Sequence, residues 1–402
     1  MPKQHQRTAQ RITRRNLIAA GAAGLGTAAL ALAAPPAAAN TANTASTAPY
    51  GPRRRAARTP TPHHVRHGIR HRTVRTNGIR MHVAEAGDEH APTVVLVHGF
   101  PELAYSWRHQ LPALAAAGYH AVAPDVRGYG RTDAPRDITG YSLRGNIADL
   151  NGLLDALGAR TAALVGHDQG AGITWAAAEL RPERFPAVAG LGVGHGPRLP
   201  KPMTEYIREN NPGRFNVVLY FQEPGVAEAE LDADPDRTLR MTLYALSGQA
   251  PYDLVPRWLT GTPEGAGFLD PLPDPGRPSR WSGWCTDAEF ACYVREFRRT
   301  GFAGAVRRYR TFDHDWHDLP QVGTHKIHQP ALYVTGELDS AYRFGALGPL
   351  REWVPGLRGV HVMPGVGHWT QQESPDEVNA HLIDFLHADY PPRRRTRRPA
   401  PD

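Results

Sequence analysis

Residues 164–170 read Leu164-Val165-Gly166-His167-Asp168-Gln169-Gly170, which places a Gly-x-Asp-x-Gly turn between an apolar strand and a helix. Glycines are needed in such a turn because it is tight and strained, and the start of the following helix presents backbone N–H groups to anionic oxygen. This is the pattern of a nucleophile elbow, a turn that exposes one reactive side chain at the end of a strand. It predicts Asp168 as a nucleophile, with a carboxylate where such turns often carry a serine hydroxyl.

Strands and helices alternate on both sides of this turn, as is typical of strands joined by crossover helices in a parallel sheet. Upstream, residues 72–86 alternate around Asn77-Gly78, a dipeptide that favours a two-residue hairpin turn, so the fold should open with two antiparallel strands. Further strands are expected at 93–97, 120–124, 161–166, 188–193, 330–335 and 359–363, with helices near 107–117, 142–157 and 170–181.

Between residues 195 and 320 the strand rhythm disappears, and the sequence becomes helical, aromatic and rich in proline and arginine. We therefore predict one α/β domain, a doubly wound and mostly parallel sheet, with a helical lid inserted after its sixth strand. Ser142 should cap the helix that follows it, and Ser374 with Glu377 should form a capping box on the closing helix. The expected segments are a signal at 1–39, a disordered basic linker at 40–70, the core at 71–194 and 321–390, the lid at 195–320, and a disordered basic tail at 391–402.

The N-terminus predicts export. Arg14-Arg15 precedes an Ala/Leu/Gly run that ends at Ala37-Ala38-Ala39, which is the pattern of a bacterial twin-arginine signal with a small-residue cleavage site. We expect the twin-arginine export machinery to carry the protein out of the cytoplasm, as a secreted or extracytoplasmic protein. Residues 1–39 hold five basic groups and no acid, so their removal lowers the formal net charge from +7 to +2. The remaining arginine runs read as solvated tails, and no nucleic-acid partner is predicted.

Two further groups follow Asp168 in the chain order that a nucleophile elbow requires, an acid and then a histidine. Asp339 follows an apolar strand at 331–334, and His368 follows the last strand. Glu337 is the alternative acid. We expect Asp339 to orient His368, and His368 to act as a base.

An oxyanion hole is expected beside the elbow. His98-Gly99-Phe100-Pro101 ends the third strand, where a fold of this type places one of the two backbone donors. The N–H groups of Phe100 and Gln169 are therefore the candidate pair.

Several longer motifs carry a family resemblance. They are HGFPE at 98–102, DVRGYG at 125–130, GHD at 166–168, YFQEPGVAEAE at 220–230, FRRTGF at 297–302, RYR at 308–310 and GHW at 367–369. Together they resemble the soluble epoxide hydrolases of the α/β-hydrolase superfamily, and the related dehalogenases share several of them. The likeness covers roughly residues 72–390.

This resemblance implies a mechanism. Asp168 would open an epoxide and form an ester, Tyr309 of the lid would protonate the epoxide oxygen, and water activated by His368 would release a vicinal diol. The partners would be the epoxide and water, and neither a metal ion nor an organic cofactor is expected.

Two residues depart from the family's pattern. Gln169 stands where the family has tryptophan, and Val217 stands where it has the first of two lid tyrosines, so either Tyr309 acts alone or Tyr220 substitutes. The alternative functions are a dehalogenase of the haloalkane or haloacid type, using the same Asp168 and His368, and a non-catalytic ligand-binding protein. The loss of tryptophan argues against the haloalkane type, and the intact acid, histidine and nucleophile argue against a binding protein.

The two cysteines, Cys285 and Cys292, are expected to be free thiols. If both lie in one helix, their Cα atoms are about 10 Å apart, which is too far for a disulfide. A bridge would require Cys285 to precede the helix.

Overall fold

The sheet begins with the predicted hairpin. In the computed structural model, which describes residues 68–343 and 347–392, β1 (Arg70–Thr76) pairs antiparallel with β2 (Ile79–Ala86). Asn77 and Gly78 connect these strands with φ angles of 41° and 78°. Positive φ at both positions is what a type I′ hairpin turn requires. The expected signal, most of the basic linker and the basic tail from residue 393 lie outside the described residues.

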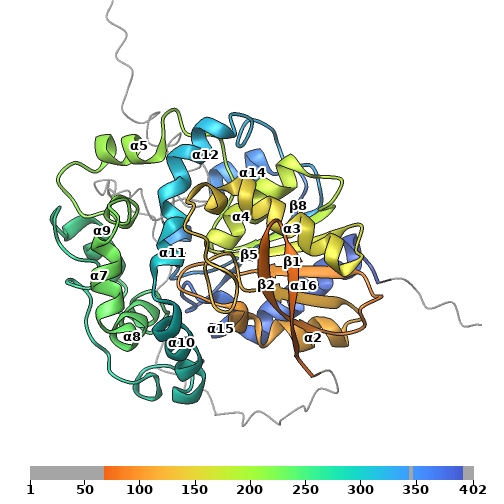
Figure 1. The fold of residues 1–402 in the computed structure, drawn as a ribbon, viewed down its shortest axis with the longest axis horizontal. Helices are drawn as coiled ribbons and strands as arrows, with labels where there is room; N and C mark the ends of the chain where they lie inside the picture. Colours follow the sequence, from red (N-terminus) through yellow and green to blue (C-terminus); the bar gives the residue numbers. More distant parts are fainter. Residues whose placement is uncertain (1–67, 344–346, 393–402) are drawn as a thin grey trace, which may run out of the picture.

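Parallel strands extend the sheet beyond the hairpin (Figure 1). The order across the eight strands is β1-β2-β4-β3-β5-β6-β7-β8, and every neighbouring pair after β2-β4 is parallel. The predicted strands are therefore confirmed, with ends that shift by no more than two residues. Their bounds are β3 Thr93–Val97, β4 His120–Pro124, β5 Ala162–His167, β6 Ala187–Leu191, β7 Ala331–Gly336 and β8 Leu357–Met363.

Helices cover both faces of the sheet, which confirms the doubly wound α/β architecture. On one face, Ile147, Leu150 and Leu154 of α3 are buried against the strands, as their spacing predicts. The fourth expected position, Leu157, is only partly buried at the end of this helix. One face carries α3 (Leu143–Leu157), α4 (Gln169–Leu180) and α14 (Leu347–Trp353), and the other carries α2 (Gln110–Ala116) and α16 (Pro375–Asp389).

One of the two predicted helix caps is confirmed and the other is wrong. The Ser142 side chain accepts a hydrogen bond from Gly145 N at 3.1 Å at the start of α3. Ser374 makes no such bond at the start of α16, because it also ends the short helix α15 (Thr370–Glu373). Its own N–H donates to Thr370 O, and its hydroxyl donates to the Glu377 carboxylate at 3.2 Å. The N–H that a capping box would give to Glu377 is therefore already occupied.

The predicted helical insertion lies between β6 and β7 and forms a separate layer beside the sheet domain (Figure 1). Its interior is aromatic, with Trp258, Phe268 and Phe297 buried, and it is continuous with Phe100 and Trp369 of the core domain. The lid helices are α5 Met203–Asn210, α6 Val217–Tyr220, α7 Val226–Ala233, α8 Pro235–Ala245, α9 Leu254–Gly261, α10 Asp287–Thr300, α11 Ala303–Arg307 and α12 Phe312–Asp318.

Both cysteine side chains are free. Cys285 lies just before α10 and Cys292 lies within it, so the arrangement that could have allowed a disulfide is present but no bridge forms. The prediction of free thiols is confirmed.

Within residues 68–343 and 347–392, no helix is long and apolar enough to cross a membrane. The longest described helices, α3 and α16, have 15 residues each, whereas a bilayer-spanning helix needs about 20.

Candidate active site

The turn between β5 and α4 presents Asp168 at the carboxyl edge of the sheet. Asp168 has a φ of 51° and a ψ of −122°, a conformation that an L-residue rarely adopts and that functional sites often contain. A Cβ atom at Gly166 would collide with the Gly170 carbonyl, and one at Gly170 would collide with the Val97 carbonyl. Only glycine fits on either side of the elbow, so the sequence holds the Asp168 carboxylate in one position, where it is 3% exposed.

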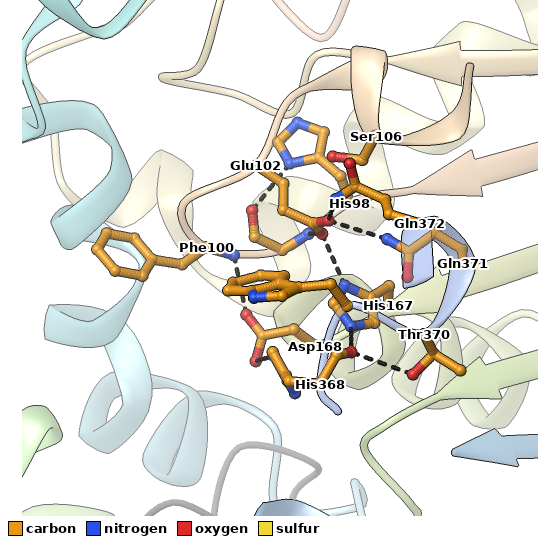
Figure 2. Close-up of polar contacts among 12 residues, drawn as sticks. His98, Phe100, Glu102, Ser106, His167, Asp168, His368, Thr370, Gln371 and Gln372 are labelled. Atoms are coloured by element: carbon orange, nitrogen blue, oxygen red, sulfur yellow. Dashed lines mark hydrogen bonds and ion pairs between the residues drawn. The ribbon is translucent and has the colours of Figure 1, made fainter. Parts of the chain in front are cut away.

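The loop after β3 meets this carboxylate from the other side (Figure 2). Phe100 N donates a hydrogen bond to Asp168 Oδ2 at 2.8 Å. A side chain at Gly99 would collide with the same carboxylate, so the close approach depends on that glycine. Gln169 opens α4 directly after Asp168, which places its N–H at the helix start. The two expected oxyanion-hole residues thus flank one carboxylate.

The base and its acid lie at the ends of the neighbouring strands β8 and β7. His368 Nδ1 lies 3.2 Å from Asp339 Oδ1 and 3.1 Å from Asp339 Oδ2, and His368 Nε2 lies 3.9 Å from Asp168 Oδ1. His368 is 2% exposed and Asp339 is fully buried. The structure therefore brings together the three residues that the motifs singled out, in the geometry of a nucleophile, base and acid triad.

The alternative acid, Glu337, faces away from the histidine. Its side chain is exposed, and its carboxylate accepts the Gly365 N–H at 3.2 Å. Asp339 is thus the acid that contacts His368.

Charges around His368 keep a proton on its ring. Burial alone would lower the pKa of this imidazole, but the negative charge and hydrogen bonds of Asp339, followed by the charge of Asp168, outweigh burial and raise the pKa to about 9. The ring is therefore an imidazolium at neutral pH. Loss of the Asp168 charge should favour the neutral ring that a base requires.

We therefore expect Asp168→Asn to lower the His368 pKa below that of the unmodified protein, because one of the neighbouring negative charges that raise it is removed. Asp339→Asn should lower it further, since Asp339 contributes both the larger charge effect and the hydrogen bonds. The measurement is the pH titration of the His368 ring proton by NMR, assigned by its loss in His368→Gln. An unchanged pKa in Asp168→Asn would contradict this electrostatic assignment.

A second carboxylate–imidazole pair lies behind the triad, and neither of its residues was predicted to have a role (Figure 2). His167 Nδ1 lies 2.6 Å from Glu102 Oε2, and His167 Nε2 lies 2.8 Å from the carbonyl oxygen of His368. Both ring nitrogens of His167 therefore lie within hydrogen-bond distance of an oxygen acceptor. The pair thereby connects the nucleophile turn to the main chain of the base.

Glu102 is the centre of this network. Its carboxylate accepts hydrogen bonds from Gln371 Nε2 and Gln372 Nε2, both at 2.9 Å, and from Gly99 N at 3.3 Å. Burial would raise the pKa of Glu102, but the charge and hydrogen bond of His167 outweigh it and lower the pKa to about 2. Glu102 therefore stays ionised and holds together the loops that carry the oxyanion hole, the nucleophile and the base. The motifs HGFPE and GHD contained both residues, but only the fold shows that they touch.

The two lid tyrosines have different surroundings. Tyr309 is 4% exposed and its ring packs against Phe100 and Phe221, with ring centres 5.6 and 4.8 Å away. Burial, reinforced by the nearby negative charge of Asp168, raises the pKa of the Tyr309 hydroxyl well above its usual value. Tyr220 instead donates its hydroxyl to Glu230 Oε2 at 2.6 Å. Tyr309 thus packs against Phe100, whose N–H contacts Asp168, whereas the Tyr220 hydroxyl is held by Glu230.

The described residues contain no group of three or more His, Cys, Asp or Glu side chains arranged to hold a metal ion. The acidic and imidazole groups of the site are instead paired with one another.

Comparison with known proteins agrees with this arrangement. The sequence model of the α/β-hydrolase fold matches residues 92–375. Epoxide hydrolase A of Mycobacterium tuberculosis is 45% identical over 316 residues, which are 78% of this chain and 96% of that protein. The chain belongs to the epoxide hydrolases of the α/β-hydrolase fold.

Solved epoxide hydrolases have the same fold as this chain. The crystal structure of epoxide hydrolase A from Mycobacterium thermoresistibile superposes with a TM-score of 0.75 at 46% identity, covering 80% of this chain and 98% of that one. An epoxide hydrolase from an endophytic Streptomyces gives a TM-score of 0.76 at 42% identity, with 80% and 96% covered. The range matched by the α/β-hydrolase sequence model, residues 92–375, contains Asp168, Asp339 and His368. Within this epoxide hydrolase, the two departures from the family's motifs, Gln169 and Val217, are both buried.

Proposed function

We propose that this chain hydrolyses an epoxide to a vicinal diol through an ester formed on Asp168. The observation that carries the proposal is that the two carboxylate oxygens of Asp168 have different contacts. Oδ2 accepts the Phe100 N–H at 2.8 Å, whereas Oδ1 lies on the side of His368, 3.9 Å from Nε2. A carboxylate suits attack on a saturated carbon, because the resulting ester has a carbonyl group that water can attack in turn.

In the first half of the reaction, Asp168 Oδ1 forms a bond to one epoxide carbon and the bond between that carbon and the epoxide oxygen breaks. The electron pair stays on the oxygen, which becomes a strongly basic alkoxide and takes the proton of Tyr309. The raised pKa of the Tyr309 hydroxyl means that this group still holds its proton when the substrate arrives. The phenolate recovers a proton from solvent later in the cycle.

In the second half, water attacks the Asp168 carbonyl carbon and His368 takes the proton of that water. Ester formation has by then removed the negative charge of Asp168, which lowers the His368 pKa from its resting value of about 9 and favours the neutral ring. The N–H groups of Phe100 and Gln169 stabilise the oxyanion, which develops on Oδ2. Collapse of this intermediate breaks the bond between the Asp168 carbonyl carbon and Oδ1. The departing alkoxide takes the proton held by His368, which releases the diol, and the regenerated Asp168 carboxyl group then loses its proton to the neutral His368 ring.

The test is product formation by the purified chain. We expect diol release from a panel of terminal and internal epoxides, no activity in Asp168→Asn, and no comparable halide release from haloalkanes or haloacids. Halide release without diol formation would assign the chain to the dehalogenases. The absence of any covalent adduct or product from the whole panel would favour a non-catalytic binding protein.

We also propose export through the twin-arginine pathway, which rests on Arg14-Arg15 and Ala37-Ala38-Ala39 in a segment outside the described residues. Cleavage after Ala39 should leave a mature chain that begins near Asn40, because small residues before the cut are what signal peptidases accept. Mass spectrometry of the protein recovered outside the cytoplasm measures this end directly. Substitution of both arginines by lysine should keep the protein inside the cell. An exported protein that retains residues 1–39 would contradict the assignment.

A further inference from the structure

The amide of Gln169 is buried beside the Tyr309 hydroxyl, and its donor atom is not held by a hydrogen bond of good geometry. Gln169 directly follows the nucleophile and is 4% exposed. Its Nε2 atom makes no hydrogen bond of good geometry with any part of the chain that the structure describes. Buried amide groups in native proteins are nearly always paired, so an exception in an active site indicates a partner that arrives with the ligand.

The neighbour of this amide is Tyr309. Burial raises the pKa of the Tyr309 hydroxyl and the charge of Asp168 adds to that rise, whereas the Gln169 amide lowers it. The Gln169 amide and the Tyr309 hydroxyl therefore lie within reach of each other, and both are close enough to Asp168 for its charge to act on the phenol.

Neither Val217 nor Tyr220 provides a second hydroxyl at this point. Val217 occupies the place where the resemblance implies another tyrosine, and it is buried. The Tyr220 hydroxyl is held by Glu230, whose carboxylate also accepts the N–H groups of Phe268 and Leu269 at 2.8 and 2.9 Å. A developing alkoxide can accept more than one hydrogen bond, and Tyr309 alone supplies only one.

We propose that Gln169 is a catalytic residue that donates an Nε2–H hydrogen bond to the epoxide oxygen while Tyr309 transfers its proton to the same oxygen. This inference rests on the proposed epoxide hydrolysis. The amide keeps its proton throughout, so the balance of the ring-opening step is unchanged. Its effect is confined to the first half of the reaction, because the epoxide oxygen has already become a hydroxyl group when water attacks the ester.

The test separates the two halves of the reaction in the full-length chain, with styrene oxide as the probe. Gln169→Met removes the donor and keeps an unbranched side chain of similar length, and Gln169→Glu replaces the donor by an acceptor. Both variants keep the backbone N–H of residue 169, so the proposed oxyanion hole is intact. Rapid mixing followed by acid quench and mass spectrometry gives the rate of ester formation, and the decay of the ester gives the hydrolysis rate.

We expect ester formation to fall roughly 10- to 100-fold in Gln169→Met, as for a hydrogen bond to a charged group, and further in Gln169→Glu. Ester hydrolysis should stay within about twofold in Gln169→Met, by the argument that it no longer involves the epoxide oxygen. Gln169→Trp, which offers an indole N–H in place of the amide, should recover part of the ester-formation rate. Thermal unfolding of each variant identifies any that does not fold.

Two results would overturn the inference. One is an ester-formation rate in folded Gln169→Met or Gln169→Glu that equals that of the unmodified chain. The other is an equal loss in both half-reactions, which indicates a structural role. Failure of the proposed function looks different, because the unmodified chain would then form no ester with styrene oxide or any other epoxide.

Discussion

Substituting His368 by glutamine should give a protein that reacts with an epoxide once and then stops. The carboxylate of Asp168 remains free to attack, but no imidazole is left to take the proton of the hydrolytic water. Loss of a general base typically slows a reaction by ~10²–10⁴-fold, so the Asp168 ester should accumulate. Intact-protein mass spectrometry should show an increase equal to the mass of one epoxide, and peptide mapping should place it on Asp168.

The matched control is Asp168→Asn, which keeps the size of the side chain and removes the attacking charge. It should show no adduct and no diol. Asp339→Asn should accumulate less of the ester than His368→Gln does and should release diol slowly. His368 is still present in this variant but has lost the acid that lies 3.1 Å from its ring and orients it. If His368→Gln carries no adduct while the unmodified chain turns over the same epoxide, His368 does not act after an ester and the proposed sequence of steps is wrong.

The sequence was sufficient for the parts of this site that follow from the fold's topology. Asp168, Asp339 and His368 each follow a strand, and parallel strands end at the same edge of a sheet, so chain order alone predicts that they meet. The Phe100 N–H could be predicted for the same reason, since β3 lies beside β5. These predictions needed only strand positions, which apolar runs mark clearly in this chain.

Contacts between loops could not be predicted, because they depend on how side chains from distant segments pack. Glu102 and His167 are 65 positions apart, and nothing in either motif indicates that their side chains lie 2.6 Å from each other. The failed capping box has a similar cause, since Ser374 is shared by two consecutive helices that the pattern treated as one. In the lid, α6 is a single turn beside aromatic side chains, so the sequence left open whether Tyr309 acts alone or Tyr220 substitutes. In the structure the Tyr220 hydroxyl donates to Glu230.

Because the two lid tyrosines have different partners, Tyr220→Phe is the control for the loss of epoxide opening expected in Tyr309→Phe. The Tyr220 hydroxyl donates to Glu230, which keeps its two backbone donors when the hydroxyl is lost. Tyr220→Phe should therefore lower the free energy of unfolding by about 1 kcal/mol, as expected for the loss of one ordinary hydrogen bond. Epoxide turnover should stay within a few fold of that of the unmodified chain.

Tyr309→Phe should by contrast lower epoxide opening by ~10²–10⁴-fold, the usual contribution of a general acid. The phenyl ring still fills the space against Phe100 and Phe221, so the loss reports on the proton and not on packing. Gln169 cannot compensate, because an amide donates a hydrogen bond but does not give up its proton to an alkoxide. The measurement is single-turnover ester formation on Asp168. A rate close to that of the unmodified chain in Tyr309→Phe, together with a large loss in Tyr220→Phe, would make Tyr220 the proton donor and would require α6 to rotate when substrate binds.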